Sequence, residues 1–75
     1  MLKDKEAFLE ELLRGIKRAE ERNKRAVLKW GQEIDINTVN YIKKYFEDKP
    51  QYHIEIIPNC GGCKNKWDVT IYFRA

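Results

Sequence analysis

Hydrophobic residues recur at helical spacing from Phe8 to Trp30. Counted at about 100° per residue, nine apolar positions fall on one side of a helix. Gly15 is the one glycine inside the pattern, and Gly31 follows it where a helix stop is expected. The spacing predicts one helix over residues 3–30, about 40 Å long. The apolar positions are Phe8, Leu9, Leu12, Leu13, Ile16, Ala19, Ala26, Val27 and Trp30.

A helix of this length exceeds the diameter of about 25–30 Å that a compact chain of 75 residues reaches. Part of its apolar side would therefore be exposed to solvent unless the helix bends back on itself or a second chain packs against it. This argument favours a homodimer or an obligate partner. Asn23 lies in the middle of the apolar side, either as a solvated helix-edge position or as a residue that sets the register of a helix pair.

A shorter helix is predicted within residues 31–48. Its apolar residues recur at spacings of three and four between positions 39 and 46. Asp35 or Asn37 is suited to be its N-cap. Residues 33–36 alternate as a strand would, so a short extra strand before the helix is also consistent with the sequence.

After Pro50, which ends the second helix, the hydrophobic period changes to two. Residues 52–56 and 67–73 alternate, and this pattern predicts a hairpin with a loop of about ten residues. Ile54 and Ile71 share a face only if the numbers of opposed residues sum to an odd number. We expect the C-terminal strand to be an exposed edge.

These elements predict a single α+β domain over residues 1–75. A long N-terminal helix and a short second helix pack on one face of a C-terminal antiparallel hairpin, in the order α-α-β-β. The chain is 43% apolar and 36% charged, which excludes both a disordered chain and a membrane span. Because no basic leader with an apolar run begins at Met1, we expect a cytoplasmic protein without membrane contacts.

The outer face of the predicted hairpin carries His53, Glu55, Tyr72 and Arg74. Tyrosine and arginine are frequent in interface hot spots. No nucleophile or phosphate-binding loop accompanies the histidine and the glutamate, so we expect no enzyme. The sequence favours a small non-enzymatic interaction module, a regulator or inhibitor that binds a partner protein surface and forms a homo-oligomer.

A basic stripe suggests an alternative function. The net charge is only +3, but basic residues concentrate between positions 14 and 29. On a continuous helix five of them lie within about 80° and could follow a nucleic-acid backbone. Pairs such as Glu21 with Arg25 at i,i+4 spacing are equally typical of a solvated helix face. The five are Arg14, Arg18, Arg22, Arg25 and Lys29.

Cys60 and Cys63 form a Cys-Gly-Gly-Cys motif in the predicted hairpin loop. Two thiolates provide half of a tetrahedral zinc site, so a zinc-bridged dimer would need two chains meeting loop to loop. His53 is too far along its strand to be a third ligand. A redox pair and a glycine-rich turn with incidental cysteines are the other interpretations. We expect no other cofactor.

Overall fold

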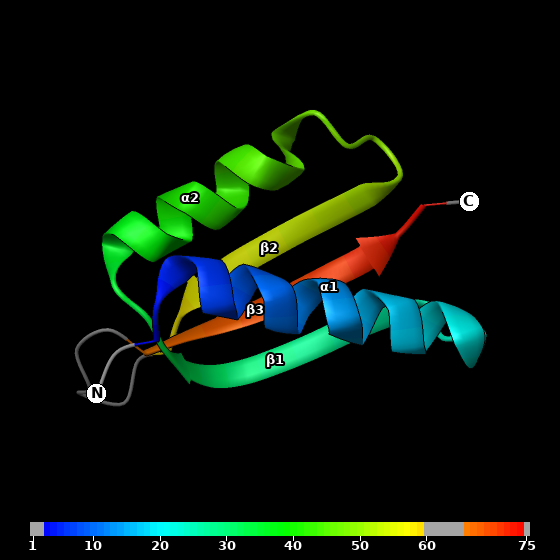
Figure 1. The fold of residues 1–75 in the computed structure, drawn as a ribbon, viewed down its shortest axis with the longest axis horizontal. Helices are drawn as coiled ribbons and strands as arrows, with labels where there is room; N and C mark the ends of the chain where they lie inside the picture. Colours follow the sequence, from blue (N-terminus) through cyan, green and yellow to red (C-terminus); the bar gives the residue numbers. More distant parts are fainter. Residues whose placement is uncertain (1–2, 60–65, 75) are drawn as a thin grey trace.

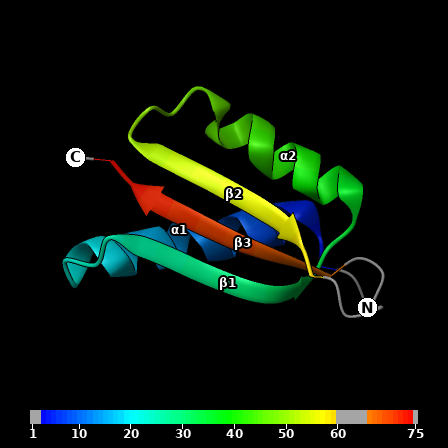
Figure 2. The ribbon, with the colours of Figure 1, turned by 180° about the vertical axis from the view of Figure 1, so that it is seen from behind.

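Two helices cover one face of a three-stranded antiparallel sheet in a computed structural model that describes residues 3–59 and 66–74 (Figure 1). Seen from behind, the strands lie in front of the helices (Figure 2). The α+β class is therefore confirmed. The elements in chain order are α1 (Lys5–Glu21), β1 (Ala26–Glu33), α2 (Ile36–Glu47), β2 (Tyr52–Pro58) and β3 (Lys66–Phe73).

The prediction of one helix over residues 3–30 is wrong, because α1 ends at Glu21 and β1 follows. Arg22 is the C-cap, and Asn23 adopts a left-handed backbone with φ of 57°. Asparagine tolerates this conformation better than other residues with a side chain, so it terminates the helix. The argument that an over-long helix needs a second chain no longer applies.

The second helix is confirmed, with Asp35 as its N-cap. The backbone N–H of Thr38 donates to the Asp35 carboxylate over 2.8 Å, and this hydrogen bond lowers the pKa of Asp35 below its ordinary value. The extra strand considered for residues 33–36 is instead the longer β1, which ends at Glu33. Ile34 is buried between the two elements.

The strand order is β1-β3-β2. The hairpin of β2 and β3 is confirmed with the expected register, in which Ile54 faces Ile71. The expectation that the C-terminal strand is an edge is wrong, because β3 lies in the centre and also pairs with β1. The edges are β1 and β2, and α2 lies between them in the chain.

The core lies between the helices and the inner face of the sheet. The Tyr52 ring closes one end of the core by edge-to-face contacts with Phe46 and Phe73. Burial at this position raises the pKa of the Tyr52 hydroxyl. Neither helix of the described chain is long and apolar enough to cross a bilayer. The largest fully buried side chains are Phe8, Leu12, Ile34, Val39, Ile42, Val69 and Ile71.

Candidate functional site

The face of the sheet that turns away from α1 and α2 carries no helix of residues 3–59 and 66–74 (Figure 2). Successive side chains of a strand point to opposite faces, so this surface collects alternate residues of all three strands. We call it the open face. It consists of Ala26, Leu28 and Trp30 of β1, Asp68, Thr70 and Tyr72 of β3, and His53, Glu55 and Ile57 of β2.

Large apolar side chains are concentrated on the open face. In the described part of the chain six such side chains are exposed, and four of them lie here. Trp30 is 63% exposed and Leu28 57%, both on β1. Ile57 on β2 is 58% exposed and Tyr72 on β3 is 42% exposed. Several large apolar side chains exposed on one face in this way are typical of an interaction site.

Polar groups lie at the end of the open face beside Tyr72. The His53 ring stacks on the Tyr72 ring with centroids 6.0 Å apart. Arg74 Nη2 lies 3.1 Å from His53 Nδ1, which accepts because a guanidinium only donates. Glu55 Oε2 is 3.8 Å from His53 Nε2. The structure thus brings together all four residues that the sequence proposed for partner binding.

A bulge in β1 fixes how Trp30 lies on the open face. The pairing of β1 with β3 shifts register between Lys29 and Gln32, and Gly31 has a positive φ of 66°. The Gly31 N–H donates to Asp68 Oδ1 over 2.8 Å. Trp30 Nε1 reaches Thr70 Oγ1 at 3.4 Å, so the indole lies over the central strand.

Sequence reasoning missed Leu28, Trp30 and Ile57 as members of this face. The first two were assigned to a helix that does not exist at these positions. The signal in the sequence for a helix end before these residues was Asn23. Asparagine is found at the left-handed position that follows the last turn of a helix, and Asn23 adopts this conformation. Ile57 follows from the alternation of β2, since its neighbour Ile56 points into the core.

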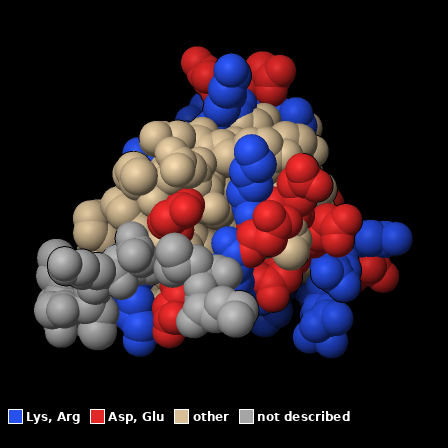
Figure 3. All heavy atoms as spheres, turned by 60° about the vertical axis from the view of Figure 1, so that its left-hand side comes forward, with Lys and Arg blue, Asp and Glu red and all other residues tan. Residues whose placement is uncertain are grey.

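The acids Glu6, Glu10 and Glu11 lie in the first half of α1, and the second half carries Arg14, Lys17 and Arg18 before it ends in Glu20 and Glu21. Figure 3 brings the starting end of α1 forward and shows acidic side chains grouped together, with basic side chains beyond them at the right-hand edge. Glu6 in the first turn and Arg18 in the last turn complement the helix dipole, whereas Glu20 and Glu21 at the C-terminal end oppose it.

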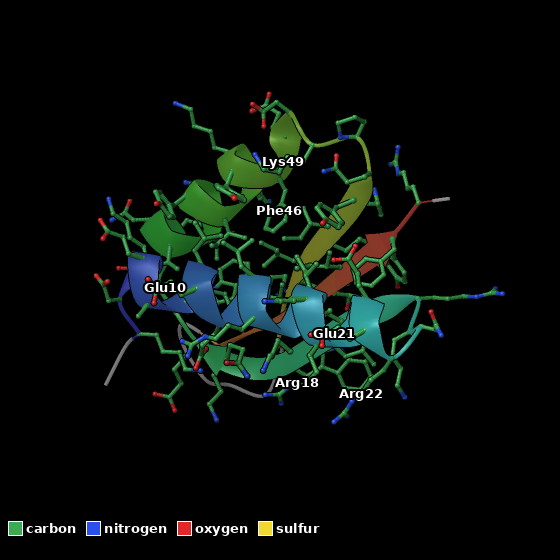
Figure 4. The ribbon with its side chains drawn as sticks, turned by 45° about the vertical axis from the view of Figure 1, so that its right-hand side comes forward. Glu10, Arg18, Glu21, Arg22, Phe46 and Lys49 are labelled. Carbon is green, nitrogen blue, oxygen red and sulfur yellow. The ribbon has the colours of Figure 1, made fainter. Side chains whose placement is uncertain are left out.

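The five residues of the predicted basic stripe do not share one helix. Arg14 and Arg18 belong to α1, Arg22 caps it, Arg25 lies in the connection and Lys29 belongs to β1. All except Arg25 nevertheless line two adjoining hollows between α1 and β1. Figure 4 shows Arg18 and Arg22 on the β1 side of α1, with Phe46 on the other side and Glu10 near the opposite end of the helix.

Cys60 and Cys63, the residues of the zinc hypothesis, lie outside the described residues. Within residues 3–59 and 66–74 no three histidine, cysteine, aspartate or glutamate side chains are grouped so as to hold a metal ion.

Comparison of the chain with protein-family models, with curated proteins and with solved structures found no match.

Proposed function

We propose that this protein is a non-enzymatic interaction module, a small regulator or inhibitor whose open face binds a partner protein. The observation that carries the proposal is the grouping of four exposed side chains on one sheet face that no described helix covers, Leu28, Trp30, Ile57 and Tyr72. Burial of such side chains against a partner is favourable by about 25 cal/mol per Å² of apolar surface.

The chemistry of the open face favours a protein as its ligand. A flat sheet face suits another protein surface, whereas small substrates are usually bound in concave sites. Trp30 and Tyr72 are aromatic residues of the types that are enriched in protein interfaces. His53, Glu55 and Arg74 would orient the partner, since charged groups at a rim contribute mainly to specificity and association rate.

Site-specific photocrosslinking tests this proposal. A benzophenone amino acid replaces Leu28 on the open face or, as the control, the exposed Leu13 on α1. We expect one defined adduct from position 28 in cell extract and none from position 13. Trp30→Ser in the same chain should reduce the yield from position 28, because it removes the most exposed apolar group beside it.

The mass of the adduct identifies the kind of partner. An adduct of twice the chain mass would make a second copy of this protein the partner, in agreement with the expected homo-oligomer. A different mass would indicate another protein as the target. Equal yields from positions 28 and 13, or no adduct at position 28, would contradict the proposal.

A further inference from the structure

Basic side chains from α1 and from β1 surround a depression on the helix side of the molecule. Arg14, Arg18 and Lys29 line one hollow together with Gly15 and Glu11. The adjoining hollows add three more basic side chains along the end of α1 and the start of β1. We call this surface the basic groove. Its basic residues are Arg14, Lys17, Arg18, Arg22, Lys24 and Lys29.

Gly15 determines that the two elements meet here. A Cβ at this position would lie 3.3 Å from Val27 Cγ1 and 3.9 Å from Lys29 Cε. The missing side chain therefore lets β1 approach the α1 backbone closely. The aliphatic part of Lys29 rests against this turn of the helix, which places its ammonium group beside Arg14 and Arg18.

The six basic side chains of the groove outnumber the two acids that line the same hollows, Glu11 and Glu21. None of the six forms an ion pair or a side-chain hydrogen bond within the described part of the chain. The i,i+4 pairs that the sequence offered, such as Glu21 with Arg25, are likewise absent from the described ion pairs. Glu11, an acid at the edge of the groove, is bound to Lys3 over 3.0 Å.

Like charges at neighbouring positions of a helix repel one another, and a bound anion would relieve this repulsion. The helix dipole accounts for basic residues in the last turn of α1, such as Arg18. It does not account for Arg14, two turns before the helix end, or for Lys29 on a neighbouring strand. The convergence of these groups from two elements therefore indicates an anionic ligand.

We propose that the basic groove binds the phosphodiester backbone of a double-stranded nucleic acid. Arg14, Arg18 and Arg22 extend over two helical turns, about 12 Å, and one strand of a duplex presents a phosphate every 3.4 Å or so along its axis. Guanidinium groups pair with phosphate oxygens in a fork geometry. The residues that line the hollows include no aromatic side chain, so bases have no stacking surface here.

This site lies on the helix side of the sheet, meets the open face at Ala26 and Leu28 of β1, and does not depend on the proposed function. The open face includes the acids Glu55 and Asp68, which would repel a polyanion. Recognition through phosphates carries no sequence information. We therefore expect binding to be independent of sequence and strongly dependent on salt.

Fluorescence anisotropy with a labelled DNA duplex of about 20 base pairs tests the inference between about 50 and 200 mM KCl. The logarithm of the association constant should fall with the logarithm of salt concentration with a slope of roughly −3 to −5, since each neutralised phosphate contributes about −0.9. A duplex of scrambled sequence should bind equally well. Absence of binding, or a slope near zero, would overturn the proposal.

Two double variants with the same change in charge locate the site. Arg18→Gln with Arg22→Gln should weaken duplex binding roughly tenfold or more and make the slope shallower by about 2. Lys43→Gln with Lys44→Gln, exposed on α2, is the control and should change affinity by no more than about twofold. Equal losses in both variants would overturn the groove as the binding site.

Two further measurements separate this inference from its alternatives. Ile57→Ser on the open face, at a residue that lines none of the three hollows, should leave duplex binding unchanged, whereas loss of open-face crosslinking would leave the groove unaffected. Vesicles of phosphatidylcholine and phosphatidylserine test an anionic membrane as the ligand. Binding to vesicles without binding to the duplex would overturn the nucleic-acid proposal. Circular dichroism should show that all variants fold, because every substituted side chain is exposed.

Discussion

Gly15 carries two opposing effects on the stability of α1. A glycine inside a helix costs about 1 kcal/mol relative to alanine. Its hydrogen atom, however, faces Val27, and a Cβ would meet Val27 Cγ1 at 3.3 Å, which is tighter than most packing contacts. The residue that weakens the helix therefore also permits the helix to pack closely on β1.

We predict that the effect of Gly15→Ala depends on residue 27. In the native background the gain in helix propensity and the close contact should nearly cancel in the free energy of unfolding. In a Val27→Ala background the contact is removed, and Gly15→Ala should stabilise the protein by about 1 kcal/mol. Urea unfolding of the four proteins measures this coupling, and an identical effect in both backgrounds would show that the contact is unimportant.

Individual residues of the candidate site were predictable where the strands alternate regularly. His53, Glu55 and Tyr72 follow from the period of two in β2 and β3, whose inner residues include Ile54 and Val69. The contact of Arg74 with His53 was not predictable in geometry, because it depends on how the chain continues after Phe73. Local periodicity assigns a side chain to a face but gives no distance across it.

At the scale of elements, the boundary between α1 and β1 was the main error. Ala26, Val27 and Trp30 fit a helical period by position, and residues 28 and 29 are leucine and lysine, which are good helix formers. The same residues also alternate between an inner and an outer face once the chain is extended. Counting positions around a helix therefore could not distinguish a helix from a strand over these residues. The left-handed backbone of Asn23, which ends α1, decides between the two structures.

We predict that substitutions of Asn23 separate by backbone conformation. Asn23→Ala should lower the free energy of unfolding by about 1 kcal/mol, because alanine in the left-handed region is strained. Asn23→Gly should leave stability unchanged or slightly higher. Denaturant unfolding measures both, and a rise in helix content in the Asn23→Ala protein would contradict a helix end at this residue.

At the scale of the whole molecule, the two faces of the sheet differ in what covers them. The class α+β and the hairpin register followed from sequence, but the strand order did not. Because β1 was predicted to be part of a helix, β3 had only one predicted neighbour in the sheet. The prediction therefore placed β3 at the edge. The pairing of Val27 with Ile71 joins distant parts of the chain, and no local pattern encodes it.

We predict opposite sensitivity of two isoleucines in the sheet. Ile71 is fully buried in the central strand, and Ile57 is 58% exposed on the open face. Ile71→Ala should lower the free energy of unfolding by roughly 2–5 kcal/mol, whereas Ile57→Ala should change it by less than about 0.5 kcal/mol. Urea unfolding measures both.

Ile71→Val, expected to cost about 1 kcal/mol, provides a folded comparison if the alanine variant is too unstable. Similar losses for Ile57→Ala and Ile71→Ala would mean that the open face contributes to the core.

The order β1-β3-β2 also affects how fast the chain folds. Neither outer strand has a sheet partner until β3, the last strand of the chain, lies between them, so both strand pairings depend on β3. Contacts between distant chain segments slow folding, and this molecule should fold more slowly than a helical bundle of the same length. Until β3 is in place, β1 and β2 expose unpaired backbone groups, which makes this interval the period of greatest exposure to aggregation.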